Sequence, residues 1–198
     1  MAALHSEFAL VVGLGNVGDR YAGTRHNAGF WYVDGLAERF GEAFREDRRL
    51  PGALARVQSA GRDVRLLKPG SLMNRSGTPV AAVARFHRIE PQRILVAHDD
   101  LDLPPGSVRL KQGGGHGGHN GLRDLDARLG TRDYWRLRIG IGHPGDRTQV
   151  TGYVLRRPAP EERRLLLEAI DRALDETDRL IIDGDLEGAM HALHSANP

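Results

Sequence analysis

Apolar and polar residues follow two different periods along this chain. Short apolar runs bounded by turn residues predict strands over residues 8–14, 54–59, 63–68, 93–98, 107–111 and 135–141. Apolar positions three and four apart predict helices over residues 28–40, 80–87, 122–129 and 161–182, with a short helical end at 185–194. Strands alternate with helices, although hairpin-like pairs of strands interrupt the pattern. We therefore expect an α/β protein, a single three-layer α/β/α domain over residues 1–198 with a mixed, mostly parallel twisted sheet.

Composition narrows the class of protein. Glycine supplies 25 of the 198 residues, but 40% of the residues are apolar and no glycine triplet recurs, which excludes collagen-like and disordered chains. The chain has no cysteine, so disulfides and thiolate metal sites are excluded and a reducing compartment is favoured. No apolar run approaches the ~18 residues of a membrane span, and the first residues lack the basic cluster of a signal peptide. We expect a cytoplasmic protein that does not contact a membrane.

The net charge of +2 conceals two regions of opposite sign. Residues 1–159 hold 24 basic and 16 acidic side chains, whereas residues 160–198 hold 4 basic and 10 acidic ones. A basic body with an acidic helical C-terminal part is typical of a protein that binds a polyanion such as nucleic acid on one face. Charge alone leaves a second interpretation open, in which the C-terminal part is one solvated helix.

Residues 13–18, with the sequence GLGNVG, match the dinucleotide-binding pattern G-x-G-x-x-G directly after a predicted strand. That function requires a helix that begins at the motif, so that its N-terminus meets the pyrophosphate. The next predicted helix begins only at Ala28. We therefore interpret the motif as a tight turn that places Asn16 in a pocket, and nucleotide binding is the weaker alternative.

A second glycine-rich segment covers residues 113–121 and precedes a predicted helix. It lacks the Gly-Lys-Ser/Thr ending of a P-loop, but its exposed backbone N–H groups favour anions or carbonyl oxygens. His116 and His119 are three residues apart and could bind a metal. Because this run contains no acidic residue and no cysteine, we expect turn histidines and no metal.

Three motif clusters, taken together, are more specific than either glycine pattern. They are GLGN at 13–16 with TRHNAG at 24–29, MNRSG at 73–77, and HDDLDLPPG at 98–106 followed by Lys111, the 113–121 segment and RLRIGIGHP at 136–144. In order and spacing they resemble bacterial peptidyl-tRNA hydrolases, from about residue 8 to residue 155. The chain departs from that family at Val17, where proline is frequent, and at Ser71 and Leu72, where threonine and an aromatic residue are usual.

The resemblance implies an enzyme that cleaves the ester between a nascent peptide and the 3′ ribose of tRNA, and so recycles tRNA in translation. It implies a cytoplasmic monomer that acts on peptidyl-tRNA without a cofactor, a metal or a stable protein partner. By resemblance His26 is the catalytic base and Asp99 is its partner. The implied substrate-binding residues are Asn16, Tyr21, Met73, Asn74 and Asn120. The basic positions that match those holding the tRNA 5′ phosphate are Lys111 and Arg138.

The residue types suit ester hydrolysis by water. The ordinary pKa of histidine, about 6.5, fits a general base, and an adjacent carboxylate fixes its tautomer and stabilises the imidazolium. Asparagine can donate to a developing oxyanion or hold peptide and water, and the chain does not reveal which of the three does which. No G-x-S-x-G elbow occurs, so a serine nucleophile is not indicated.

Each assignment has an alternative. Met73 is equally well a core methionine, and Asp99 and the asparagines could be turn residues. Lys111 and Arg138 could be ordinary surface charges. The whole chain could also be an RNA-binding module that has lost catalysis, although the presence of His26 and Asp99 favours the enzyme.

Overall fold

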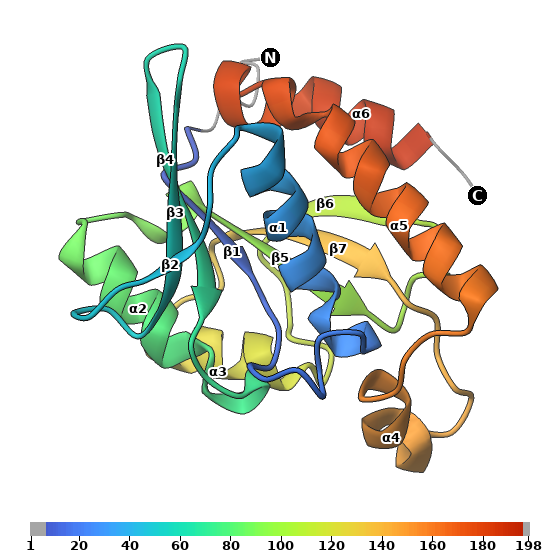
Figure 1. Cartoon of the computed structure of the whole chain (residues 1–198). Helices are drawn as coiled ribbons and strands as arrows, with labels where there is room; N and C mark the ends of the chain where they lie inside the picture. Colours follow the sequence, from blue (N-terminus) through green and yellow to red (C-terminus); the bar gives the residue numbers. More distant parts are fainter. Residues whose placement is uncertain (1–6, 196–198) are drawn as a thin grey trace.

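The computed structural model describes residues 7–195, in which seven strands form one sheet (Figure 1). Their order across the sheet is β2-β3-β4-β1-β5-β7-β6. The central strands β4, β1, β5 and β7 are parallel, and the outer pairings are antiparallel. The strands are β1 (Leu10–Gly13), β2 (Arg45–Glu46), β3 (Gly52–Ser59), β4 (Arg62–Pro69), β5 (Ile94–Asp100), β6 (Val108–Gln112) and β7 (Trp135–Gly140). The mixed sheet is confirmed, and only the short edge strand β2 was not expected.

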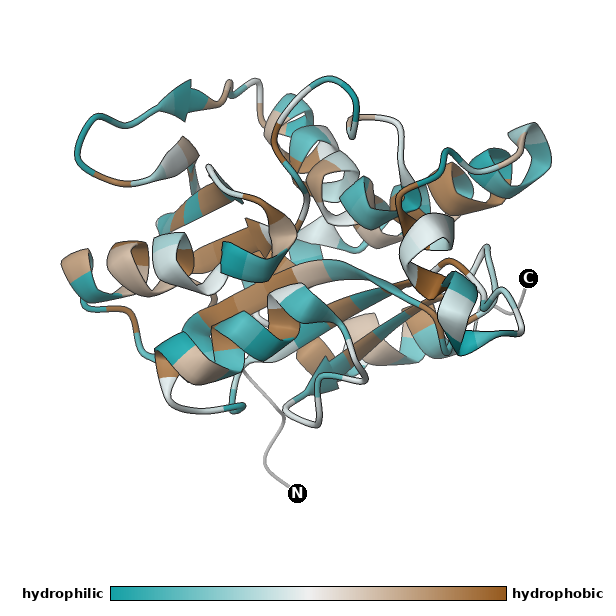
Figure 2. Cartoon of the chain, turned by 90° about the horizontal axis from the view of Figure 1, so that it is seen from below, coloured by the Kyte–Doolittle hydropathy of each residue, from teal (hydrophilic) through white to brown (hydrophobic). Residues whose placement is uncertain are grey.

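Helices cover both faces of the sheet (Figure 1). Helices α1, α5 and α6 pack on one face, and α2 and α3 pack on the other. Figure 2 shows apolar residues concentrated along the strands between these two helical layers. The helices are α1 (Ala28–Arg39), α2 (Gly77–Phe86), α3 (Asn120–Leu129), α4 (Val150–Val154), α5 (Pro160–Asp175) and α6 (Leu186–Ser195). The three-layer arrangement is therefore confirmed. Among the described residues, no helix combines the length and the apolar character needed to cross a membrane.

The C-terminal helical region differs from the sequence prediction. Instead of one helix over 161–182, α5 ends at Asp175 and a π-helical segment, Asp178–Asp183, follows it. The hydroxyl of Thr177 donates to the carbonyl of Leu174, a local bond that competes with the regular helical ladder. Gly184 ends the segment in the left-handed conformation, at φ 69°. The chain then reverses into α6, which packs along the edge strand β6.

Close packing of α1 on the sheet sets the position of the residues that precede it. A Cβ on Gly29 would lie 2.3 Å from the carbonyl oxygen of Ala97 in β5, and a Cβ on Gly13 would lie 2.3 Å from the carbonyl oxygen of Gly29. Only glycine permits this approach, and it brings the short 3₁₀ turn Arg25–Asn27 to the carboxyl end of β5. The GLGNVG motif therefore serves helix–strand packing. The α-helix begins only at Ala28, so no helix N-terminus opens at the motif as dinucleotide binding requires.

Candidate active site

A cavity of about 700 Å³ lies at the carboxyl ends of β1, β5 and β7, the edge where parallel sheets place their sites. Helix α4, which was not predicted from the sequence, forms one wall through Val150 and Val154. The structure brings all nine sequence-predicted residues to this cavity: Asn16, Tyr21, His26, Met73, Asn74, Asp99, Lys111, Asn120 and Arg138.

His26 and Asp99 form a buried pair on its floor. The Nδ1 atom of His26 lies 2.9 Å from Oδ2 and 3.0 Å from Oδ1 of Asp99. The strand predicted over residues 93–98 continues in the structure to Asp100, so Asp99 is a strand residue and its backbone is held in the sheet. Burial by itself would lower the pKa of His26, but the charge and hydrogen bond of Asp99 raise it above its ordinary value. Burial opposes ionisation of Asp99, yet its interactions with His26 and His119 hold the pKa of this carboxyl well below its usual range.

An ionised carboxylate only accepts hydrogen bonds, so Nδ1 of His26 carries a proton that points at Asp99. In neutral His26 the lone pair therefore resides on Nε2. This is the tautomer that a histidine base needs, and the fixed strand position of Asp99 selects it.

His119, which we expected from the sequence to be a turn histidine, is a third member of this cluster. Its Nδ1 accepts the backbone N–H groups of Gly121, at 3.1 Å, and Leu122, at 3.3 Å, and so caps α3. Because Nδ1 is an acceptor, the proton of neutral His119 resides on Nε2, which lies 2.9 Å from Asp99 Oδ1. Asp99 thus accepts from two histidines at once. The available signal was a histidine three residues before the predicted helix at 122–129, which in the structure begins at Asn120.

The same three residues are the one group of possible metal ligands among residues 7–195. Their ligand atoms, from His26, Asp99 and His119, all lie within 4.8 Å of one another. However, the histidine nitrogens that face the centre of this group are the ones that carry protons for Asp99. In this arrangement their lone pairs point elsewhere, and the cluster fits a hydrogen-bonded relay better than a metal centre.

Asn16 is held on both its backbone and its side chain. Its N–H donates to Asn27 Oδ1 over 2.9 Å, and Asn27 Nδ2 donates to the carbonyl of Asn16 over 3.0 Å. Its own Oδ1 accepts the N–H of Met73 over 2.6 Å. The side-chain carbonyl is therefore occupied, and Nδ2–H₂ is the polar group that Asn16 can offer to a ligand. Asn27, whose role the sequence did not reveal, is the residue that fixes this turn.

Met73 is both a core residue and a residue of the cavity wall, the two interpretations that the sequence left open. It is buried within the cluster of side chains under α2 and α3, and it also lines the cavity. By contrast, Asn74 and Asn120 are exposed, the first within a 3₁₀ turn and the second at the start of α3. Their amide groups are therefore available at the cavity wall.

Basic side chains lie along the β6–β7 side of the cavity. Lys111 is exposed, whereas Nε of Arg138 donates to Asp100 Oδ2 over 2.7 Å and its charge is partly offset. Burial opposes ionisation of Asp100, but the bond from Arg138 lowers the pKa of this carboxyl. Arg136 was not among the expected site residues. It is buried and donates to the carbonyls of Gly115, at 2.6 Å, and Gly114, at 2.7 Å, so it anchors the glycine-rich loop.

Comparison with known proteins identifies the family of this chain. The profile of the family described as peptidyl-tRNA hydrolase matches residues 10–198. A peptidyl-tRNA hydrolase of Halorhodospira halophila is 55% identical over 195 residues, which cover 98% of this chain and all of that protein. One from Neisseria gonorrhoeae is 53% identical over 186 residues, 94% of this chain and 96% of that one. The crystal structure of peptidyl-tRNA hydrolase from Acinetobacter baumannii superposes with a TM-score of 0.93 at 47% identity and covers 98% of each chain. This chain therefore belongs to the peptidyl-tRNA hydrolase family.

Proposed function

We propose that this protein hydrolyses the ester between the peptide and the 3′ ribose of peptidyl-tRNA by activating water with His26 and Asp99. The observation that carries the proposal is the buried pair, with 2.9 Å between His26 Nδ1 and Asp99 Oδ2, at the floor of a cavity of about 700 Å³. An ester needs only one good base and a stabilised oxyanion, because its leaving alcohol departs more readily than an amine.

Water is deprotonated at His26 Nε2 while it attacks the ester carbonyl carbon. The imidazolium that forms is stabilised by the Asp99 carboxylate, which stays ionised. The carbonyl oxygen becomes the oxyanion, and the tetrahedral intermediate collapses with release of the ribose 3′ oxygen. The proton held on His26 then passes to that oxygen, so the histidine returns to its neutral state.

We assign to asparagine side chains the donors that bind the substrate and stabilise the oxyanion. Asn16 offers Nδ2–H₂ because Met73 N–H occupies its carbonyl, so its role is that of a donor to a carbonyl oxygen of the substrate. Asn74 and Asn120 also offer exposed amides to this cavity, and a donor placed at the oxyanion is worth about 2.7–4 kcal/mol of barrier. Tyr21 contributes a half-buried ring at the cavity edge, next to the terminal nucleotide.

Lys111 and Arg138 hold the tRNA 5′ phosphate. Both line the same side of the cavity, and an ammonium and a guanidinium are both suited to phosphate oxygens. The nucleic acid would then lie over β6 and β7, and the peptide would extend from the ester toward Asn16.

Release of free peptide from acylated tRNA in the presence of a chelator tests the function. We expect N-acetyl-aminoacyl-tRNA to be converted to N-acetyl-amino acid and intact tRNA at the same rate with and without chelator. Binding of tRNA without any turnover of fresh substrate would instead support an RNA-binding module. Loss of turnover that is restored by a divalent metal would assign the cluster of His26, Asp99 and His119 to a metal centre.

We further propose that the protein acts as a monomer in the cytoplasm. Light scattering of the purified chain, alone and at assay concentration, should give the mass of one copy, 21.8 kDa. Activity that appears only with a species of twice that mass would contradict a monomeric enzyme.

A further inference from the structure

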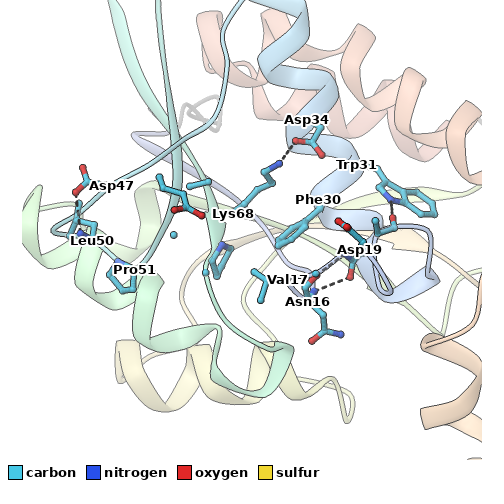
Figure 3. A pocket seen from close by; sticks show the side chains of 18 residues that line it. Asn16, Val17, Asp19, Phe30, Trp31, Asp34, Asp47, Leu50, Pro51 and Lys68 are labelled. Carbon is cyan, nitrogen blue, oxygen red and sulfur yellow. Dashed lines mark hydrogen bonds and ion pairs between the residues drawn. The ribbon is translucent and has the colours of Figure 1, made fainter.

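A second cavity of about 510 Å³ lies beside the first and shares Asn16 with it (Figure 3). It is bounded by the turn after β1, the start of α1 and the loop between β2 and β3. In Figure 3, Leu50 and Pro51 lie on one side of this pocket and Val17 and Asp19 lie on the other. The mechanism uses none of these four residues.

Part of the lining of this second cavity is apolar. Phe30 and Trp31 of α1 line it, and Val17 is one of the few large apolar side chains left exposed, at 43%. Such a surface, directly next to the site that holds the ester, suits a short stretch of extended polypeptide.

The rim is acidic, although the body of the protein is basic. Four carboxylates line the cavity, from Asp19, Asp34, Glu46 and Asp47, against the single ammonium of Lys68. Lys68 is engaged by Asp34 at 2.6 Å, and its Nζ lies 4.4 Å from the centre of the Phe44 ring. Within residues 7–195, no basic side chain pairs with the other three carboxylates.

The catalytic cavity has more basic than acidic side chains in its lining. Its walls carry four basic side chains, from Lys111, Arg136, Arg138 and Arg147, and three carboxylates, from Asp99, Asp100 and Asp102. Asp99 is bonded to two histidines and Asp100 to Arg138, whereas Lys111 is exposed on the side where the nucleic acid is proposed to lie. A peptidyl-tRNA has one strongly anionic end and one end whose charge varies with its sequence. The two cavities are thus complementary to the two ends of one molecule, with Asn16 at the boundary.

We propose that the second cavity is a subsite for the peptide residues that precede the esterified one, and that it favours peptides with a cationic group there, either a lysine or arginine side chain or a free α-amino group. This inference rests on the proposed function of the first cavity. Asn16 fits the role of a guide between the two cavities, because its backbone is clamped by Asn27 and its free amide can bind a peptide carbonyl. An extended peptide advances about 3.3–3.6 Å per residue, so a substrate with a single N-acetylated residue is too short to use the subsite.

The test compares three substrates on the same tRNA: N-acetyl-Ala, N-acetyl-Lys-Lys-Ala and N-acetyl-Glu-Glu-Ala. We expect kcat/KM for the lysine peptide to exceed that for the glutamate peptide by about three- to tenfold at low salt, because exposed charges interact weakly. The ratio should shrink as salt approaches 0.1 M and beyond, where the Debye length is ~10 Å. The N-acetyl-Ala substrate reports the function of the first cavity separately.

The double variant Asp19→Asn, Glu46→Gln removes two of the unpaired carboxylates and should bring the lysine-to-glutamate ratio close to one. Because the ratio is taken within one enzyme, a general loss of activity cancels. Glu42→Gln, an exposed carboxylate in the segment between α1 and β2 and outside the cavity, is the matched control and should keep the wild-type ratio.

Hydrolysis of all three substrates with a ratio near one in the wild type would overturn the subsite and leave the function intact. A ratio that persists in the double variant would also overturn it, since the discrimination would then come from elsewhere. No hydrolysis of N-acetyl-Ala-tRNA would overturn the proposed function itself. Quenching of Trp31 fluorescence by the free peptide Lys-Lys-Ala, absent in Trp31→Phe, would still report the subsite in that case. Equal quenching by Glu-Glu-Ala would contradict its charge preference.

Discussion

His119 Nε2 donates to the carboxylate of Asp99 over 2.9 Å, at the oxygen that also lies 3.0 Å from His26. The same imidazole caps α3 through Nδ1, so the helix cap fixes the tautomer that serves Asp99. The local structure of α3 and the orientation of the carboxylate are therefore coupled through one side chain.

His119→Asn separates these two roles, because asparagine is a good N-cap but is too short to reach Asp99. We expect His119→Asn to keep the contribution of the helix cap to stability and to lose about tenfold in kcat, the equivalent of a charged hydrogen bond of about 1.5 kcal/mol. His119→Ala should lose the same activity and in addition about 1 kcal/mol of stability. Urea denaturation and single-turnover rates of both variants are the measurements. Equal activity of His119→Asn and wild type would exclude a positioning role.

The pH dependence of kcat/KM follows from the pKa of His26. Only the neutral imidazole accepts a proton, and Asp99 raises the pKa of His26, so the acidic limb should lie above the ordinary value of 6.5. In Asp99→Asn the charge is gone while burial remains, and the limb should move to lower pH. The raised pKa of His26 also affects stability. It stabilises the folded protein at pH values below the pKa of His26 in the unfolded chain, and this contribution is lost as the pH rises through the pKa of His26 in the folded protein. An acidic limb at the same pH in both proteins would show that another group titrates.

Salt dependence of tRNA binding tests the phosphate site. Lys111→Ala and Arg138→Ala should each reduce the slope of the logarithm of the tRNA-binding constant against the logarithm of the salt concentration by about one, the contribution of one phosphate contact. Arg138→Ala should weaken binding more, because it also leaves the charge of Asp100 without its partner. Arg85→Ala, an exposed arginine of α2 outside the cavity, is the control and should leave the slope nearly unchanged. Unchanged slopes in the first two variants would place the phosphate elsewhere.

Gly29→Ala tests whether helix packing places the base. The added Cβ would lie 2.3 Å from the carbonyl oxygen of Ala97, so α1 must move away from β5 and carry His26 with it. We expect a loss of about 1–3 kcal/mol in stability, as for other overpacked sites, and a fall in kcat larger than the change in KM. Gly152→Ala adds the same methyl group in α4 with no atom closer than 4.0 Å, and this control variant should retain the stability and the kcat of the wild type. A stable and fully active Gly29→Ala would mean that the position of His26 does not depend on this contact.

The sequence predicted much of this architecture because the strands are short apolar runs and the central helices have clear apolar faces. The position of Asp99 at the end of β5 and of Asn16 after β1 followed from the rule that parallel strands end at one edge. The pairing of His26 with Asp99 came from resemblance, since it depends on the contact of Gly29 with β5, which no periodicity shows. The roles of His119 and Arg136 could not be predicted, because each depends on side chains that meet backbone groups only in the folded chain. That residues 1–198 form one domain remains a prediction.

The most direct test of the central claim is single-turnover hydrolysis of N-acetyl-aminoacyl-tRNA by His26→Ala, measured with chelator and at enzyme concentrations that saturate the substrate. We predict a rate at least about 10²-fold below that of the wild type, with tRNA affinity unchanged, because a general base contributes about 10²–10⁴-fold. Added imidazole should restore part of the rate in this variant. A rate within tenfold of the wild type would contradict the assignment of His26 as the base.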